Sequence, residues 1–224
     1  MLTFPSSTLV GRAVPKTAFY RNLELSARLK QRFVDDVAGI EWVAKIAPST
    51  LPVEEGSEVH EIVVFRFSLK TEDTPDDVFL AIDRQMPRHT VFLLQYGERF
   101  RLLLNYKEWA DRAGGTFRIV KTFRTPWTGG EELSLPIEGL SMDRIYENMA
   151  GRISGFGTAS ASDTRQVIAL QDTIRSKRRQ AEALQKRVRA EKRFARQMEL
   201  SSEVRALRQE LEQLSHRLDE LIKQ

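Results

Sequence analysis

Two apolar runs meet at a glycine in residues 91–106, which read Val91-Phe-Leu-Leu-Gln-Tyr-Gly-Glu-Arg-Phe-Arg-Leu-Leu-Leu-Asn-Tyr106. The runs cover residues 91–96 and 100–106, and Gly97 with Glu98 lies between them. Apolar runs on both sides of a short turn that contains glycine are typical of a β-hairpin. The sequence therefore predicts a pair of antiparallel strands here.

Further elements are predicted on both sides of this hairpin. Val63, Phe65 and Phe67 alternate with polar residues, which indicates a strand. The remaining predicted elements are a helix over residues 26–46, the strand over 59–70, a helix over 74–87, a strand over 117–123 and a helix over 141–153. This order predicts an α+β domain over residues 1–153, with a largely antiparallel sheet packed on helices.

A helical arm is predicted after this domain. Small residues dominate positions 154–162, which predicts a flexible linker, and neither glycine nor proline occurs in residues 163–224. Two heptad frames follow each other in the arm and differ by two residues. The first frame contains Val167, Leu170, Ile174, Ala181, Leu184, Val188, Ala195 and Met198, and the second contains Val204, Leu207, Leu211, Leu214, Leu218 and Leu221. A break near residues 200–202 would give two helices or an antiparallel hairpin, whereas one bent helix and a coiled coil remain alternatives.

Charge is split along the arm. Ten Lys and Arg residues stand against two Glu in residues 175–196, whereas four stand against six acidic residues in 197–224. The ten are Arg175, Lys177, Arg178, Arg179, Lys186, Arg187, Arg189, Lys192, Arg193 and Arg196. Such a cluster can neutralise DNA phosphates without reading the bases. Pairing with the acidic half, and solvated charges outside a coiled coil, are the alternatives. The second frame is the predicted coiled-coil interface and a possible homo-oligomer contact.

Composition excludes several kinds of site. The 224 residues contain no cysteine, so disulfides, thiol nucleophiles and thiolate metal sites are absent. His60, His89 and His216 lack the spacing of metal ligands, so we expect no metal and no cofactor. The start of the chain lacks a signal-peptide pattern, and no apolar run has the length of a membrane span. We therefore expect a cytoplasmic protein without membrane contact.

No catalytic residues are predicted. A metal-dependent nuclease needs an acidic residue on one strand and an acid-x-Lys pair on the next. Asn105-Tyr-Lys107 supplies the lysine without the acid, and Asp83 lies on a predicted helix, away from the expected geometry. Alternating basic residues of the strands could also form a basic sheet face, although charges that point outward from a half-buried sheet are the favoured explanation. These residues are Arg66, Lys70, Arg99, Arg101, Arg118 and Arg124.

Several short motifs resemble a known family. They are Pro15-Lys-Thr-Ala-Phe-Tyr, Ile40-Glu-Trp-Val-Ala-Lys-Ile-Ala-Pro-Ser-Thr, His60-Glu-Ile-Val-Val-Phe, Tyr106-Lys-Glu-Trp, Thr125-Pro-Trp and Glu138-Gly-Leu-Ser-Met-Asp-Arg-Ile-Tyr-Glu-Asn. Together they resemble the bacterial domain-of-unknown-function family numbered 4391, from about Phe4 to Ile153. The family is associated with restriction and anti-phage gene clusters, beside helicase and DNA-methyltransferase proteins.

The resemblance implies an accessory role in a DNA-targeting assembly. We expect a non-enzymatic subunit whose body docks on a larger DNA-acting enzyme, such as a helicase or methyltransferase. The arm would then contact protein and DNA. A nuclease with an unrecognised site and a self-assembling coiled-coil protein are the alternatives.

Overall fold

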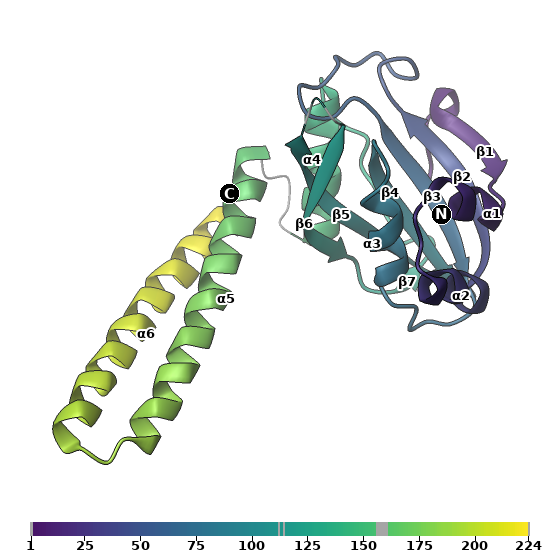
Figure 1. The fold of residues 1–224 in the computed structure, drawn as a ribbon. Helices are drawn as coiled ribbons and strands as arrows, with labels where there is room; N and C mark the ends of the chain where they lie inside the picture. The colour runs from purple at the N-terminus through teal and green to yellow at the C-terminus, as the bar shows by residue number, and fades with distance from the viewer. Residues whose placement is uncertain (1, 112, 114, 156–160, 224) are drawn as a thin grey trace. The chain divides into compact units, whose positions relative to one another are not determined.

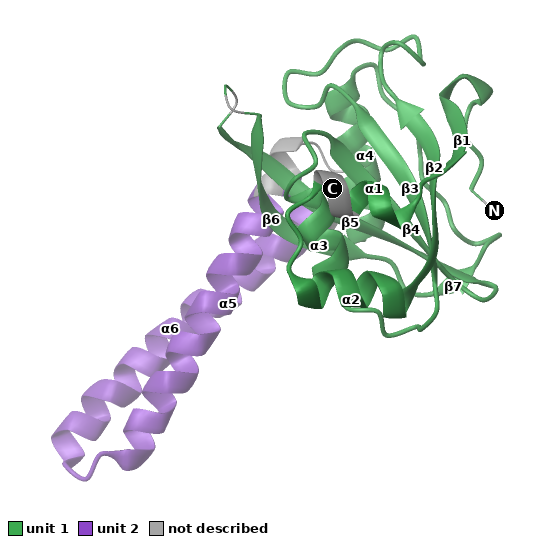
Figure 2. Ribbon diagram, turned by 45° about the vertical axis from the view of Figure 1, so that its right-hand side comes forward, with its two compact units in different colours: residues 1–158 green, residues 159–224 purple. Residues whose placement is uncertain are grey.

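The chain divides into two compact units, residues 1–158 and 159–224, in the computed structural model (Figure 2). The structure describes residues 2–111, 113, 115–155 and 161–223. Part of the predicted linker, residues 156–160, lies outside the described residues. Among the described helices, none combines the length and the apolar character that crossing a membrane requires.

A mixed sheet forms the centre of the first unit (Figure 1). Its strands are β1 (Leu9–Ala13), β2 (Val37–Ile46), β3 (Ile62–Leu69), β4 (His89–Tyr96), β5 (Arg99–Asp111), β6 (Thr116–Arg124) and β7 (Thr128–Gly129). They lie in the order β1-β2-β3-β4-β5-β6, and β7 pairs with β5. The β3–β4 pair is parallel and the others are antiparallel, so the α+β class is confirmed with one parallel pair.

The predicted hairpin is the pair β4 and β5. Gly97 has a positive φ of 58°, a conformation that glycine adopts without steric cost. Val91 faces Leu104 across the pair, and Leu93 faces Leu102. All four side chains are buried, because both faces of the sheet are covered at these strands. Strands buried on both faces have continuous apolar runs, as residues 91–94 do.

Helices cover both faces of the sheet. The helices of this unit are η1 (Ser6–Thr8, a 3-10 turn), α1 (Lys16–Asn22), α2 (Ala27–Asp36), α3 (Asp77–Asp83) and α4 (Met142–Ser154). Phe33 of α2 and Phe79 of α3 share an aromatic core with Phe67 of β3. On the opposite face, Tyr146 of α4 stacks on Tyr106 of β5 with ring centroids 5.9 Å apart.

The prediction of one helix over residues 26–46 is wrong in its second half. Helix α2 ends at Asp36, and Val37–Ile46 form β2, which is hydrogen-bonded to β1 and β3. Lysines satisfy the carbonyls at the end of α2, since Lys16 Nζ donates to Phe33 O at 3.1 Å and Lys70 Nζ donates to Val34 O at 2.8 Å. Apolar residues at helical spacing continue into β2, so the periodicity alone conceals the change. Pairing with two strands decides the conformation.

The second unit is a pair of long helices, α5 (Ala161–Ala190) and α6 (Phe194–Lys223). Lys177 of α5 pairs with Glu210 of α6, and Gln197 near the start of α6 bonds Val188 near the end of α5. This reversed order makes the helices antiparallel, a helical hairpin (Figure 1). The sequence predicts the break at residues 200–202, but the structure places it at residues 191–193.

Candidate nucleic-acid interface

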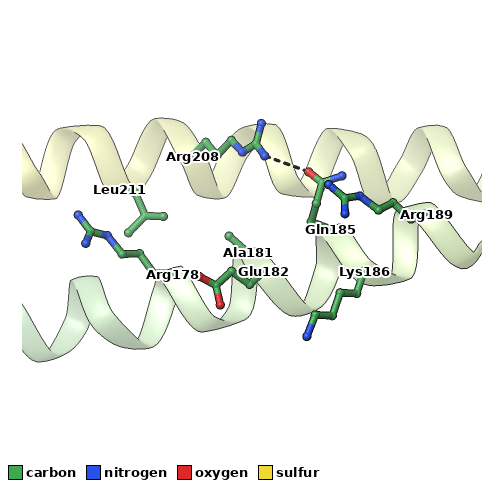
Figure 3. Close-up of a pocket in the computed structure, with 8 residues that line it drawn as sticks. All are labelled: Arg178, Ala181, Glu182, Gln185, Lys186, Arg189, Arg208 and Leu211. Atoms are coloured by element: carbon green, nitrogen blue, oxygen red, sulfur yellow. Dashed lines mark hydrogen bonds between the residues drawn. The ribbon is translucent and has the colours of Figure 1, made fainter.

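The apolar seam of the hairpin follows the two heptad frames. In α5, Ala181 is buried, and Leu184 and Val188 are half-buried. In α6, Val204 is buried, and the other members of the predicted interface are half-buried: Leu207, Leu211, Leu214, Leu218 and Leu221. Figure 3 shows Ala181 and Leu211 directed toward each other from the two helices. The second frame therefore packs within this hairpin.

The position of the turn explains the offset between the frames. Ala195 and Met198, which the first frame includes, are exposed, whereas Leu200 is buried. Leu200 lies four residues before Val204, so it continues the second frame. Because each helix of a hairpin has its own frame, the buried residues of α6 follow the second frame from Leu200 onward. The offset revealed two helices but not the position of their connection.

Side chains rather than glycine or proline stabilise the connection. The main-chain N–H of Arg193 donates to Glu191 Oε1 at 2.9 Å. Gln197 Nε2 donates to the carbonyl of Val188 at 3.2 Å, which satisfies an acceptor at the end of α5. A turn of this kind leaves no strong sequence signal, because Glu, Lys and Arg also favour helices.

Part of the charge split is satisfied within the hairpin. Lys177 lies in the seam, and its Nζ is 2.8 Å from Glu210 Oε2. Arg175 pairs with Asp172 at 2.5 Å, and Arg196 pairs with Glu199 at 2.6 Å. Each of these last two pairs is exposed and joins two residues of the same helix. Exposed ion pairs contribute little net stability, so they leave the cations available to a stronger partner.

One side of the hairpin is a basic groove of about 380 Å³. Four cations, Arg178, Lys186, Arg189 and Arg208, line it beside a single acidic residue, Glu182. Arg208 Nη2 also donates to Gln185 Oε1 across the groove at 3.0 Å (Figure 3). Because Gln185 is neutral, this bond does not compensate the charge of Arg208. We call this groove, with its four cations, the basic groove. Its long, open shape and positive charge suit a polyanion.

The other predicted cations lie elsewhere on the hairpin. Arg179 lines a separate shallow surface together with Arg175. Arg187, Lys192 and Arg193 are exposed outside the groove. The ten predicted cations therefore lie on several sides of α5, in the connection and at the start of α6, instead of forming one strip. Arg208 was missed, because it belongs to the acidic half of the arm and reaches the groove only through the antiparallel pairing.

Comparison with known families gives one match. The family described as Domain of unknown function (DUF4391) matches residues 2–211. The chain belongs to this family. The match extends beyond the body through α5 into α6, so the hairpin is part of the DUF4391 pattern and the resemblance confined to residues 4–153 was too short. No curated protein and no solved structure matches the chain.

The basic residues on the sheet of this DUF4391 chain have partners. Arg99 pairs with Glu72 at 2.5 Å, Arg118 with Glu108 at 3.2 Å, and Arg124 with Asp76 at 2.6 Å. Arg66 pairs with Glu41, Lys70 donates to the Val34 carbonyl, and Arg101 lies over the Trp127 ring with its Cζ 4.6 Å from the centroid. Acids and carbonyls thus compensate much of this face, and the groove is the stronger candidate for a polyanion site.

A buried polar cluster lies inside the DUF4391 body. Lys107 Nζ is 2.6 Å from Asp83 Oδ1, and both side chains are fully buried. Asn105 Nδ2 donates to the other carboxylate oxygen of Asp83 at 3.0 Å, and Thr122 Oγ1 donates to Asn105 Oδ1 at 2.7 Å. Asp83 lies on a helix, as predicted, but the fold brings it beside Lys107. The end of α3 crosses beside β5, a proximity that the sequence pattern does not show.

Burial controls the charges of this cluster. It raises the pKa of Asp83 and lowers the pKa of Lys107, and the attraction between the two groups opposes both changes. Lys107 Nζ is also held by the carbonyls of Asp83, Met86 and Arg88. Both carboxylate oxygens of Asp83 are already hydrogen-bonded, and the cluster has no access to solvent. Its geometry is that of a structural contact that holds α3 against β5.

Proposed function

We propose that this protein is a non-enzymatic accessory subunit of a DNA-targeting assembly in the cytoplasm, of the restriction or anti-phage type. The body docks on a larger DNA-acting enzyme, such as a helicase or methyltransferase. The hairpin, packed as an antiparallel coiled coil, contacts protein and DNA. The gene clusters associated with the DUF4391 family support the assembly, and the basic groove supports the contact with DNA.

The basic groove is the observation that carries this proposal. Its four cations face one acidic residue, so a strand of phosphates gains several favourable contacts. Phe194 is the only aromatic residue of α5 and α6, and it lies outside the groove, so base stacking is not expected there. Binding through the groove is therefore governed by the phosphate backbone, without sequence preference.

Co-purification from the native host tests the assembly. The full chain carries an affinity tag and replaces the chromosomal copy, and its partners are identified by mass spectrometry. We expect a helicase, methyltransferase or other DNA-acting enzyme to co-purify after nuclease treatment, because the body makes a protein contact. Recovery of the tagged chain without such an enzyme would contradict the proposal.

A metal-dependent nuclease is the second candidate, and one observation favours it. Asp83, Asn105 and Lys107 meet at one point, as an acid, a polar group and a lysine do in such enzymes. The carboxylate is sealed from solvent, so this activity requires an opening of α3. Incubation with DNA and Mg²⁺ or Mn²⁺ tests it, with Lys107→Met as control at a temperature where circular dichroism shows that this destabilised variant is folded. Cleavage by the wild type that the control lacks would establish the nuclease and displace the accessory role.

A further inference from the structure

A stacked pair of an arginine and a tryptophan lies on the body near the start of β5. The guanidinium of Arg101 lies over the ring of Trp127, with its Cζ 4.6 Å from the ring centroid. Trp127 also packs against the aromatic core of the body, and both residues are half-buried. Arginine and tryptophan are enriched among the residues that contribute most to the affinity of protein interfaces. The pair is therefore a candidate contact for another protein.

The backbone holds Trp127 in its place beside β5. Between the paired positions of β6 and β7, residues 125–127 lie opposite only residues 101 and 102 of β5. One extra residue of this kind is a β-bulge, which redirects the side chains of its strand. The main-chain N–H of Thr125 donates to the carbonyl of Leu102 at 3.0 Å, and the N–H of Leu102 donates to Thr125 Oγ1 at 3.0 Å. The bulge is thus fixed before a partner binds, so the stacked pair loses little conformational freedom on binding.

Three arginines lie together here, and Arg101 is the one without an acidic partner. Arg99 donates to both carboxylate oxygens of Glu72, at 3.0 Å and 2.5 Å. Arg124 Nη2 lies 2.6 Å from Asp76 Oδ2. Within the described part of the chain, the guanidinium of Arg101 has neither an ion pair nor a hydrogen bond, and only its Nε is sealed from solvent. Its Nη groups are therefore free to donate to a group that a partner brings.

The charges around Arg101 favour a single carboxylate over a nucleic acid strand. Burial and the neighbouring Arg124 lower the pKa of Arg101. Attraction to Asp76 and Glu72 opposes this change, so both acids lie close enough to act on the guanidinium. The two acids already pair with the other two arginines, which leaves the cluster with one positive charge. One carboxylate neutralises that charge, whereas the acids would repel the further phosphates of a strand.

We propose that Arg101 and Trp127 form the contact through which the body docks on its larger enzyme, and that this contact receives an aspartate or glutamate side chain of the enzyme. The Nη groups of Arg101 donate to the carboxylate in a charge-assisted pair. Apolar atoms beside that carboxylate pack on the indole ring of Trp127. The proposal rests on the accessory role proposed above, because it names the site and the chemistry of that docking.

A photo-crosslinker beside the pair tests where the enzyme docks. In the tagged full chain, p-benzoylphenylalanine replaces Gly129, an exposed residue at which an added Cβ meets no atom within 4 Å. Gly129 pairs with Arg99, and paired residues project from the same face of a sheet, so the probe lies on the face of Arg101. After irradiation in the native host, we expect crosslinks to a DNA-acting enzyme at a peptide that contains aspartate or glutamate. Crosslinks to that enzyme from a matched probe at Arg144 of α4, with none from position 129, would overturn the proposal.

Charge reversal tests the role of the arginine. We expect Arg101→Glu to lower affinity for the recovered enzyme about thirtyfold, the loss typical of an arginine at the centre of an interface, measured by surface plasmon resonance. Arg144→Glu changes an exposed arginine of α4 and is the matched control, which keeps the wild-type affinity. Circular dichroism verifies that both variants are folded. Replacement of the crosslinked acid of the enzyme by arginine should restore binding to Arg101→Glu, because the two charges are then exchanged.

The outcomes separate this docking contact from the accessory role itself. Equal affinity of the wild type and a folded Arg101→Glu variant for the enzyme would overturn the contact, while the co-purified enzyme would still support the accessory role. If the wild type co-purifies with no DNA-acting enzyme, the accessory role fails, and the docking contact fails with it. Loss of affinity in Arg101→Glu alone, together with its recovery by the exchanged charges, is the result that the proposal predicts.

Discussion

Lys107 and Asp83 are the residues through which α3 is fixed to β5. Their ion pair is fully buried and completed by Asn105 and by main-chain carbonyls. Such a pair stabilises a fold no more than well-packed apolar residues at the same positions would. Removal of one partner, however, leaves a buried charge without compensation. The sequence shows a lysine in an apolar strand, and only the fold shows what it faces.

Replacement of Lys107 tests this interpretation. We expect Lys107→Met to lower the free energy of unfolding of the body by about 3 kcal/mol, because Asp83 remains buried without its cation. The double variant Asp83→Asn with Lys107→Met removes both charges, so it should be more stable than the single variant. Urea unfolding followed by tryptophan fluorescence measures the body alone, since all three tryptophans, Trp42, Trp109 and Trp127, belong to it. Additive losses in the double variant would show that the pair is not coupled.

Asp143 at the start of α4 gives the body a pH dependence. Burial alone would raise its pKa, but hydrogen bonds from the main-chain N–H groups of Glu58, Val59 and Ser57 and from the Ser57 hydroxyl outweigh burial and lower it. A lowered folded-state pKa means that this stabilisation is complete above the unfolded value of about 3.9. It is lost as the pH falls through the folded value.

The variant Asp143→Asn should therefore be less stable than the wild type by about 2 kcal/mol at pH 7. The difference should decrease as the pH falls below about 4, where the wild-type carboxylate also becomes neutral. Urea unfolding at several pH values measures both quantities. A difference that stays constant with pH would assign the effect to packing rather than to the carboxylate.

At the scale of elements, local sequence patterns predicted the strands whose conformation depends mainly on neighbouring residues. The hairpin of β4 and β5 and the strands β3 and β6 were predicted from alternation and from Gly97. Strand β2 was not, because its apolar spacing is compatible with a helix and its partners β1 and β3 decide its state. The edge strand β1 has exposed side chains throughout and so leaves no apolar pattern.

The hairpin of α5 and α6 depends on its seam. Val204 is 4% exposed, so Val204→Asp would bury a charge without a partner and should destabilise the hairpin by about 3 kcal/mol. Ala206→Asp, an exposed position two residues away, is the matched control. Thermal melting by far-UV circular dichroism should show earlier loss of helix in Val204→Asp, with unchanged tryptophan fluorescence. Equal melting of both variants would mean that α6 is not held by this seam.

At the scale of the whole molecule, the positive net charge of +4 belongs to the hairpin. The basic groove combines cations of α5 with Arg208 of α6, so it exists only when the hairpin is folded. The sequence predicted a basic segment but not this groove, because the groove depends on which helix faces pair. The proposed DNA binding therefore requires the folded hairpin.

The salt dependence of DNA binding tests the central claim most directly. The groove variant removes the four cations of the basic groove through the changes Arg178→Ala, Lys186→Ala, Arg189→Ala and Arg208→Ala. The matched variant Arg28→Ala, Arg84→Ala, Arg144→Ala and Arg152→Ala removes four exposed cations of the body. Affinity for a double-stranded oligonucleotide is measured by fluorescence anisotropy over a range of salt concentrations. We predict that the groove variant binds more weakly and that its slope of log affinity against log salt is shallower by about three to four, whereas the body variant keeps the wild-type slope. A groove variant with the wild-type slope, or a wild type that does not bind DNA at low salt, would contradict the account.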